Sequence, residues 1–313
     1  MSYPTLRLHP RKEESVLRFH PWIFSGAIAS FSAPVEDGDL VSVVDSKGHP
    51  LGTGHFGGGS IAVRLLSFDA EEVIDRAFYK RRLEAALRLR LSCDLVRPVG
   101  SSDSPNTTYR LVHGEGDSLP GLIIDIYART AVVQAHSLGM HQARQTIAEV
   151  LWEVFAEAGD PVLPLEGVYY KSETTLPTRD MRELASDGFL IGHTEAAPIY
   201  ENGVRFTPDW LKGQKTGFFI DQRDNRALVA HYAKGRTALN AFCYTGGFSI
   251  YALHAGAKRV DSLDSSAKAM YLTEQHVALN FGADCPRHHS VTEDAFDYLE
   301  RMPEGEYDLI ILD

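Results

Sequence analysis

Two carboxylates and a glycine-rich turn in the last third of the chain have the types and spacing of a site for a nucleotide-like ligand. An apolar run at 239–243 breaks into Tyr244-Thr245-Gly246-Gly247, typical of a strand that enters a glycine turn before a helix. A second predicted strand, residues 260–263, ends on Asp264 about 20 residues later, where a carboxylate suits the two hydroxyls of a ribose. The turn lacks the G-x-G-x-x-G pattern of a dinucleotide site. S-adenosylmethionine (SAM), an adenosine ligand without a pyrophosphate, therefore fits better than NAD.

Strands that alternate with helices must position these residues. Such alternation is typical of an α/β fold with a parallel, doubly wound sheet. In chain order, the pattern predicts a strand from residue 237, a helix over 248–255, a strand over 260–263, a helix over 267–280, a strand over 287–291, a helix over 295–301 and a strand over 307–312. A helix over 225–233 and a hairpin about residues 201–203 precede them.

The earlier part of the chain predicts different elements. Strand-like runs at 22–24, 40–45, 51–56 and 61–66 indicate a small β-rich domain. A helix over 71–91 and an α+β segment with a hairpin over 122–134, a helix around Val150 and a strand at 167–170 come next. The first of these helices carries six cations that scatter around its axis. They could meet phosphate, although a solvated helix surface is the simpler interpretation, and they are Arg76, Lys80, Arg81, Arg82, Arg88 and Arg90.

Composition argues against several classes of protein. The chain has no apolar run of about 18 residues and no apolar stretch of a signal peptide, so we expect a cytoplasmic protein without a membrane span. Cys93, Cys243 and Cys285 show neither metal-ligand spacing nor a paired framework, so we expect no metal. The formal net charge of −11 argues mildly against RNA. Residues 1–100, however, hold 13 Lys+Arg and 12 Asp+Glu, a net of +1.

Two stretches of sequence resemble a known family. K-T-G-F-F-I-D-Q-R-D-N-R at 215–226, followed by L-N-A-F-C-Y-T-G-G-F-S at 239–249, resembles the large-subunit rRNA cytosine-C5 methyltransferases that carry an N-terminal PUA domain. H-P-W-I-F-S-G-A-I at 20–28 and L-G-T-G-H-F at 51–56 resemble the opening of a PUA domain, a small RNA-binding barrel. The resemblance implies a PUA-like domain over 1–70, an α+β central domain over 71–195 and a SAM-binding methyltransferase domain over 196–313, with four of the seven strands of a class I methyltransferase sheet.

The resemblance also implies a set of cofactor residues. Asp264, with Ser265, matches the acid that binds the ribose, and Asp294 matches the acid at the adenine amino group. Asp264 could also cap a helix while it binds the ribose, and Asp294 alone would be interpreted as a helix cap. Arg223 is expected to meet the carboxylate of the cofactor. The other implied cofactor residues lie in the segment over the cofactor or in the loop beneath its methionine portion, and they are Phe218, Gln222, Asn240, Tyr244, Thr245 and Gly246.

Catalysis is expected to need residues beyond these. Asp313 matches the acid of the Asp-Pro-Pro motif that faces the target base, and in the resembled family the nucleophilic cysteine comes later. That thiolate adds across C6 of cytosine and makes C5 able to accept a methyl group. We expect Cys243 to lie beside the cofactor without being this nucleophile. We also expect the 313 residues to be inactive alone, and to form a homodimer through the open edge of the fourth strand.

The sequence therefore predicts a SAM-dependent methyltransferase that acts on 23S rRNA at cytosine C5. Two alternatives stay open. One is an RNA-binding protein whose methyltransferase domain is a scaffold without catalysis, and the other is a methyltransferase of another rRNA base. An NAD-dependent oxidoreductase is disfavoured, because the pyrophosphate-binding glycines are missing.

Overall fold

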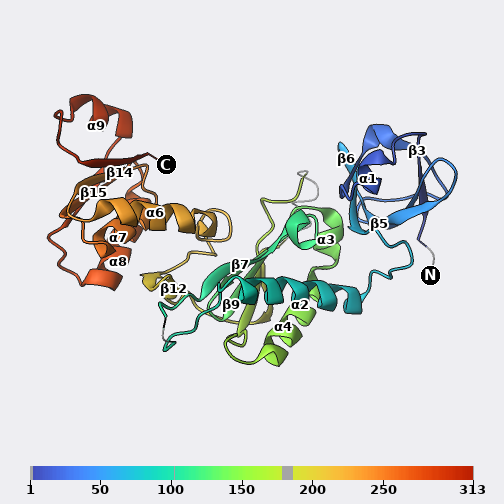
Figure 1. Ribbon diagram of the computed structural model, residues 1–313, viewed down its shortest axis with the longest axis horizontal. Coiled ribbons are helices and arrows are strands. Elements are labelled where there is room, and N and C mark those ends of the chain that lie inside the picture. The colour runs from blue at the N-terminus through green and yellow to red at the C-terminus, as the bar shows by residue number, and fades with distance from the viewer. Residues whose placement is uncertain (1–2, 102, 178–185, 313) are drawn as a thin grey trace. The chain divides into compact units, whose positions relative to one another are not determined.

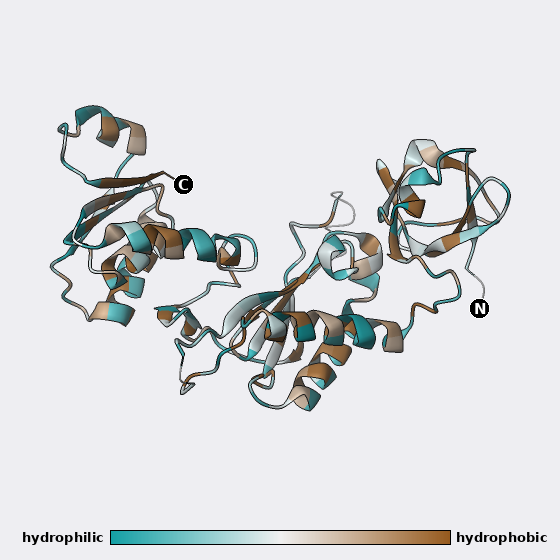
Figure 2. Ribbon diagram, viewed as in Figure 1, coloured by the Kyte–Doolittle hydropathy of each residue, from teal (hydrophilic) through white to brown (hydrophobic). Residues whose placement is uncertain are grey.

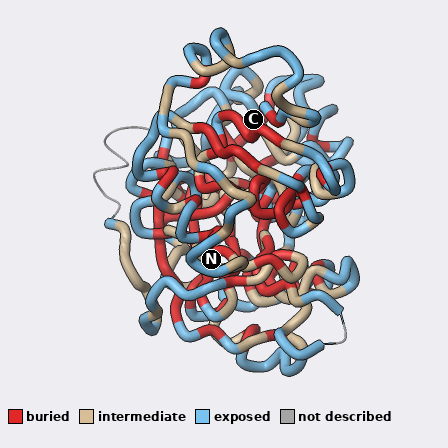
Figure 3. Tube along the Cα trace, turned by 90° about the vertical axis from the view of Figure 1, so that its left-hand side faces the viewer, coloured by how far each residue is buried: buried red, intermediate tan, exposed pale blue. Residues whose placement is uncertain are grey.

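The computed structural model describes residues 3–101, 103–177 and 186–312. The chain forms two compact units (Figure 1). The first unit consists of Met1–Ser101, Thr107–Glu195 and Trp210–Thr216, and the second of Ser102–Asn106, Ala196–Asp209 and Gly217–Asp313. Figure 3 shows that buried stretches (red) run through the interior of the fold, whereas exposed residues (pale blue) gather in the outer loops.

Six strands near the N-terminus form one mixed sheet with the order β2-β6-β5-β4-β1-β3. β1 and β4 pair in parallel, and the other neighbours in this sheet pair antiparallel. Leu6, Val41, Val43 and Leu65 belong to its own core. The four predicted strands are confirmed, and β1 and β3 add to them. The elements are β1 (Thr5–Leu8), α1 (Glu14–Leu17), β2 (Trp22–Phe24), η1 (Ser25–Ala27), β3 (Ile28–Phe31), β4 (Leu40–Val44), β5 (Pro50–Phe56) and β6 (Ile61–Ser67).

A second sheet in the first unit has the order β11-β10-β9-β8-β7. Helices α2 (Arg76–Ser92) and α4 (Arg144–Ala158) share a core with it that buries Leu83, Ile147 and Phe155. Figure 2 shows brown and teal alternating along both helices, as expected for helices with one buried face. The other elements are β7 (Thr108–His113), η2 (Gly114–Asp117), β8 (Leu122–Tyr127), β9 (Thr130–Ala135), α3 (Leu138–Gln142), β10 (Gly167–Tyr170) and β11 (Gly188–Gly192).

The start of α2 differs from the prediction. The helix begins at Arg76 and not at residue 71, because Asp75 caps it: its side chain accepts a hydrogen bond from the backbone N–H of Phe78 at 2.9 Å. A cap supplies an acceptor for one of the unpaired N–H groups in the first turn. The residues before Asp75 therefore form a turn-rich approach to the helix and not its first turns.

The six cations of the α2 region pair with carboxylates of the protein itself. Arg76 and Lys80 contact Glu153 of α4 at 2.7 and 2.5 Å, and Lys80 also contacts Glu157 at 2.9 Å. The other pairs are Arg81 and Arg82 with Glu72, Arg88 with Glu84, and Arg90 with Asp117. These pairs favour the interpretation of α2 as a packing helix with neutralised charge over that of a phosphate-binding stripe.

The second unit has a four-stranded parallel sheet with the order β16-β15-β14-β17. α7 and α8 lie on one side of these strands and α9 on the other, as in a doubly wound fold (Figure 1). The predicted elements are confirmed with ends shifted by one or two residues. They are β12 (Ile199–Glu201), β13 (Val204–Phe206), η3 (Ile220–Gln222), α6 (Arg223–Ala233), β14 (Thr237–Ala241), α7 (Gly247–His254), β15 (Arg259–Asp264), α8 (Ala267–Phe281), β16 (His288–Thr292), α9 (Ala295–Arg301) and β17 (Leu309–Leu312).

Candidate cofactor site

The glycine turn after β14 is tightly folded. Phe242, Tyr244 and Gly246 all have positive φ, at 57°, 47° and 75°. A Cβ on Gly246 would lie 2.5 Å from Cγ2 of Thr273 in α8, so only glycine fits this position without a shift. The Thr273 hydroxyl in turn donates to the carbonyl of Tyr244 at 3.1 Å. The turn is thus held against α8 at the carboxyl end of β14, where open α/β sheets bind their ligands.

Asp264 lies at the end of the neighbouring strand β15 and holds the turn from the other side. Its Oδ2 accepts the N–H of Tyr244 at 2.9 Å and its Oδ1 accepts the N–H of Ser266 at 2.8 Å. Ser266, and not Asp264, caps α8 by accepting from Ala269 N–H at 3.3 Å. A carboxylate has about four acceptor positions, so two backbone donors leave capacity for a ribose diol. Asp264 can therefore position the loop and bind a ligand.

Asp294 does act as a helix cap. Its Oδ1 accepts from the N–H groups of Phe296 at 2.8 Å and of Asp297 at 3.3 Å at the start of α9. Beside it, the rings of Phe242 and Phe296 meet edge to face, with centroids 5.9 Å apart, and are 39% and 70% exposed. An exposed aromatic pair next to an acid resembles the wall that a purine needs, one side apolar and the edge polar.

A buried histidine connects the glycine turn to the segment after β13. Nδ1 of His276 lies 2.9 Å from the carbonyl of Thr245, and its Nε2 accepts from the N–H of Thr207 at 3.1 Å. Burial lowers the pKa of His276, which keeps the ring neutral. A neutral ring with Nδ1 protonated satisfies both contacts at once. The turn is thereby fixed by three side chains from α8 and β15: those of Thr273, His276 and Asp264.

Glu201 organises a charged cluster on the same unit. This fully buried carboxylate accepts from Arg226 through both oxygens, at 2.8 and 2.7 Å, and lies 3.5 Å from Arg223. The hydroxyl of Tyr251 donates to it at 3.0 Å. The cluster carries one negative and two positive charges. An anionic group would be stabilised beside it, because Coulomb energies grow where water is excluded.

Two of the predicted cofactor residues face inward. Asn240 is fully buried and donates from Nδ2 to Ser249 of α7 at 2.9 Å, while its Oδ1 has no partner in the described part of the chain. Phe218 packs on Phe206, with ring centroids 4.9 Å apart, and its ring lies 4.7 Å from the guanidinium of Arg226. Both residues therefore support the walls of the site, and neither presents an exposed surface.

The cysteine beside the turn is poorly suited to attack. Cys243 is buried, and its Sγ lies 3.5 Å from Sδ of Met270. Burial, with the nearby charge of Asp264, raises the pKa of the Cys243 thiol to about 12. A nucleophilic cysteine needs its thiolate form, which this environment disfavours.

The remaining predicted residues are placed as follows. The side chain of Gln222 precedes α6 and accepts from Asn225 at 2.8 Å, Ser265 is exposed beside Asp264, and Asp313 lies outside the described residues. The segment expected to fold over the cofactor crosses from the first unit to the second after Thr216, and its implied cofactor residues Phe218, Gln222 and Arg223 all belong to the second unit. Among the described residues, no group of His, Cys, Asp and Glu could hold a metal, and none of the helices could cross a membrane.

Comparison with known proteins decides which family has this arrangement. A family described as PUA-like domain matches residues 6–68, and one described as S-adenosylmethionine-dependent methyltransferase matches residues 178–313. Ribosomal RNA large subunit methyltransferase I of Alteromonas mediterranea is 38% identical over 312 residues, covering 98% of this chain and 74% of the relative. The protein of that name from Shewanella denitrificans is 39% identical over 315 residues, covering 98% and 75%. This chain belongs to that family. It is a SAM-dependent methyltransferase with an N-terminal PUA-like domain.

Solved structures agree with the fold of this methyltransferase. A protein from Streptococcus mutans, described as a SAM-dependent methyltransferase, aligns with a TM-score of 0.79 at 24% identity, covering 100% of this chain and 77% of that one. SMU.776, crystallised with SAH, aligns with a TM-score of 0.80 at 24% identity, covering 100% and 76%. At this level of identity, the likeness supports the fold alone.

Sequence reasoning misses several residues that hold the site of this methyltransferase. In the sequence Glu201 reads only as part of a hairpin turn, yet it is the buried partner of two arginines. His276 and Thr273 lie in a helix whose periodicity reports packing and not hydrogen bonds. The one available signal is Arg226, which ends the segment at 215–226 and requires a buried acid from elsewhere in the chain.

Proposed function

We propose that this methyltransferase acts on large-subunit rRNA and that the accepting atom is C5 of a cytosine. The substrate class, large-subunit rRNA, is supported by the similarity along 98% of the chain to proteins named Ribosomal RNA large subunit methyltransferase I. The PUA-like match at residues 6–68 supports an RNA substrate. The cytosine C5 assignment rests on the resemblance of residues 215–226 and 239–249 to the C5 family.

SAM supplies the reactive methyl group, and the residues of the second unit would orient it. We assign the ribose to Asp264, which keeps acceptor capacity at the end of β15, and the adenine edge to Asp294, with Phe242 and Phe296 beside the ring. The methionine carboxylate is assigned to Arg223, where the Glu201 cluster has an excess of positive charge. In this arrangement the glycine turn lies beneath the methionine portion.

The chemistry at C5 requires a thiolate that adds to C6, and we propose that Cys243 does not supply it. Its raised pKa and its burial oppose a thiolate at neutral pH. Of the other cysteines in the chain, Cys93 is exposed at the end of α2 in the first unit, and Cys285 lies in the loop before β16. We propose that the nucleophile is none of these three cysteines. From the resemblance, we assign to Asp313 the role of the Asp-Pro-Pro acid that faces the target base.

Methyl transfer from radiolabelled SAM to 23S rRNA tests the proposal with the natural full-length protein. We expect label in the rRNA, and we expect Asp264→Ala to weaken SAM binding by about 1–3 kcal/mol because charged hydrogen bonds are lost. Asp284→Ala removes an exposed loop carboxylate and serves as the matched control. SAM binding without transfer to any rRNA would favour the scaffold alternative, and unchanged binding by the Asp264 variant would contradict the ribose assignment.

We also propose that the PUA-like domain supplies most of the affinity for RNA. A chain that lacks residues 1–70 should bind 23S rRNA more weakly, and its affinity should depend less on salt. The deletion ends before Asp75 and so keeps α2, which belongs to the core of the following sheet, and of that core it removes Leu66. Equal affinity of the shortened and complete chains would contradict this division of roles.

A further inference from the structure

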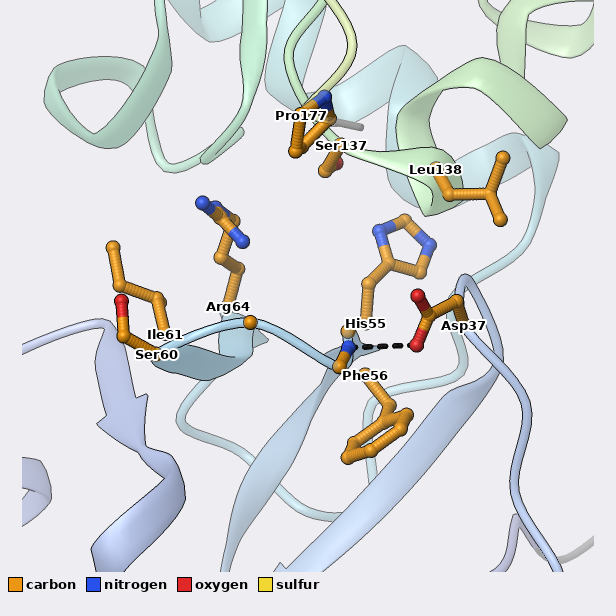
Figure 4. A pocket seen from close by; sticks show the side chains of 12 residues that line it. Asp37, His55, Phe56, Ser60, Ile61, Arg64, Ser137, Leu138 and Pro177 are labelled. Carbon is orange, nitrogen blue, oxygen red and sulfur yellow. Dashed lines mark hydrogen bonds between the residues drawn. The ribbon is translucent and has the colours of Figure 1, made fainter. Parts of the chain in front are cut away.

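A cavity of about 310 Å³ lies within the first unit, between the β5–β6 loop and the start of α3. Figure 4 shows Asp37, His55 and Arg64 on one wall, with Ser137, Leu138 and Pro177 across from them. The loop that closes one side is Gly57-Gly58-Gly59-Ser60. This volume lies at the lower end of the range of ~300–1,000 Å³ for small-molecule sites. None of the residues assigned to SAM lines the cavity, so it has no role in the chemistry described above.

Arg64 brings a charge into this cavity without a partner of its own. Within the described part of the chain, its guanidinium makes no hydrogen bond and no ion pair, in contrast to the cations of α2. Partial burial lowers the pKa of Arg64, an effect that the charge of Glu115 opposes without an ion pair, and the arginine stays charged at neutral pH. A half-buried guanidinium with five donors and no protein acceptor is an arrangement that a ligand can complete.

His55 adds a second group that lacks a partner. The side chain is 94% buried, since only 6% of its surface is exposed, and its Nδ1 has no hydrogen-bond partner among the described residues. Gly139 of α3 fixes the ring, because a Cβ on that residue would lie 2.2 Å from the imidazole. Burial, with the charge of Arg64, lowers the pKa of His55 to about 4, so the ring is neutral. The ring therefore lines the cavity without adding a charge.

Asp37 completes the wall. Its Oδ1 accepts the backbone N–H of Gly58 at 2.6 Å, the dashed line in Figure 4, while Oδ2 has no protein donor in the described part of the chain. The cavity thus combines one cation, one carboxylate and a neutral imidazole. A phosphate would be attracted by the charge of Arg64 and repelled by the charge of Asp37. A neutral ligand that carries both donors and acceptors matches Arg64 and Asp37 together, and the neutral ring of His55 adds no charge that opposes it.

We propose that this cavity binds one unpaired nucleobase of the rRNA, with its carbonyl or ring acceptors on Arg64 and its N–H groups on Asp37. The inference rests on the proposed rRNA substrate. Proteins read single-stranded RNA by taking splayed bases into pockets and bonding their polar edges. A guanidinium reads base acceptors through two parallel bonds, and a carboxylate accepts from an exocyclic amino group. The cavity holds one base and excludes a duplex by size.

Arg64→Met in the full-length protein is the first test, with 23S rRNA as the probe and affinity measured across a series of salt concentrations. A base contact predicts about tenfold weaker binding at every salt concentration and an unchanged slope of log K against log[salt]. A phosphate contact predicts a slope smaller by about 0.7–0.9. Arg88→Met, on the exposed face of α2, is the matched control, since its side chain is 68% exposed and pairs with Glu84 at 3.8 Å.

Asp37→Asn distinguishes a nucleobase from a phosphate in the cavity without the arginine variant. It therefore tests the inference even if Arg64→Met fails to fold. The N–H of Gly58 holds the amide oxygen, so the NH2 group replaces the open Oδ2 and meets the donors of the base. We expect weaker RNA binding, whereas a phosphate in the cavity would bind more tightly once the negative charge is gone. Glu149→Gln, an exposed position in α4, controls for the change in net charge.

Three outcomes overturn the inference. Binding by Arg64→Met equal to that of Arg88→Met removes the role of the guanidinium. A smaller slope of log K against log[salt] for Arg64→Met, together with tighter RNA binding by Asp37→Asn, assigns the cavity to a phosphate. Failure of the unaltered protein to bind or methylate 23S rRNA refutes the proposed function itself. This result is distinct from failure of the cavity inference, because it is measured without either variant.

Discussion

Glu201→Gln should strongly destabilise the second unit of the methyltransferase. The carboxylate is fully buried and faces both Arg226, which is 2% exposed, and Arg223, which is 9% exposed. Gln keeps the size of the side chain and part of its hydrogen bonding, but it removes the buried negative charge that both guanidinium groups face. Removing one partner of a buried ion pair costs about 3–5 kcal/mol. With m-values of ~1–3 kcal/mol/M in urea, the midpoint should fall by about 2 M.

The protein carries its own internal reference for this measurement. All three tryptophans, Trp22, Trp152 and Trp210, lie in the first unit. Far-ultraviolet circular dichroism reports both units, whereas tryptophan fluorescence reports the first. We expect the substitution to move the dichroism transition to lower urea and, where the units unfold separately, to leave the fluorescence transition in place.

Glu293→Gln is the matched control in the same unit, because Glu293 pairs with Arg301 at the surface, where both side chains are partly exposed. Surface pairs contribute about 0–1 kcal/mol. The reasoning about the Glu201 cluster is refuted if the two variants lower the urea midpoint equally.

Three further predictions follow from particular contacts. Gly246→Ala should lower the free energy of unfolding by more than Gly235→Ala. Both positions have positive φ, at 75° and 72°, which alone costs ~1–2 kcal/mol in a residue with a side chain, but only at Gly246 would the new Cβ lie 2.5 Å from Cγ2 of Thr273. Equal losses of stability in urea melts would contradict the clash. The free energy of unfolding of the first unit should fall as pH drops from about 6.5 to 4, because the folded state keeps His55 neutral to about 4 while the unfolded chain takes up a proton; the fall should be smaller in His55→Gln, and an unchanged pH profile would contradict the shift. Cys243→Ser in the full-length enzyme should retain methyl transfer with a modest loss, and abolished transfer would restore Cys243 as the nucleophile.

The elements of the second unit can be predicted well from sequence because their signals are local. β14 and β17 are short, largely apolar runs. The residues that follow the parallel strands β14 and β15 must share one edge of the sheet. This rule alone brings the glycine turn and Asp264 together. The hydrogen bonds of Tyr244 and Ser266 to that carboxylate agree with the placement.

Long-range pairing cannot be predicted from these local patterns. Glu201 and Arg226 are 25 residues apart, and nothing in the local pattern joins a hairpin turn to the start of a helix. Arg76 and Lys80 of α2 are interpreted from sequence as part of a solvated or phosphate-binding surface, because their partners Glu153 and Glu157 lie on another helix. A capping bond and a ligand bond also demand the same residue type, so the sequence does not assign Asp294 to one of them.

The central claim is tested most directly by identifying the methylated nucleoside. Unmethylated 23S rRNA is incubated with SAM and the full-length protein, digested to nucleosides and analysed by mass spectrometry beside a reaction with Asp264→Ala. We predict 5-methylcytidine, absent or strongly reduced with the variant. A methyl group on another base, or on a cytidine atom other than C5, would contradict the proposal.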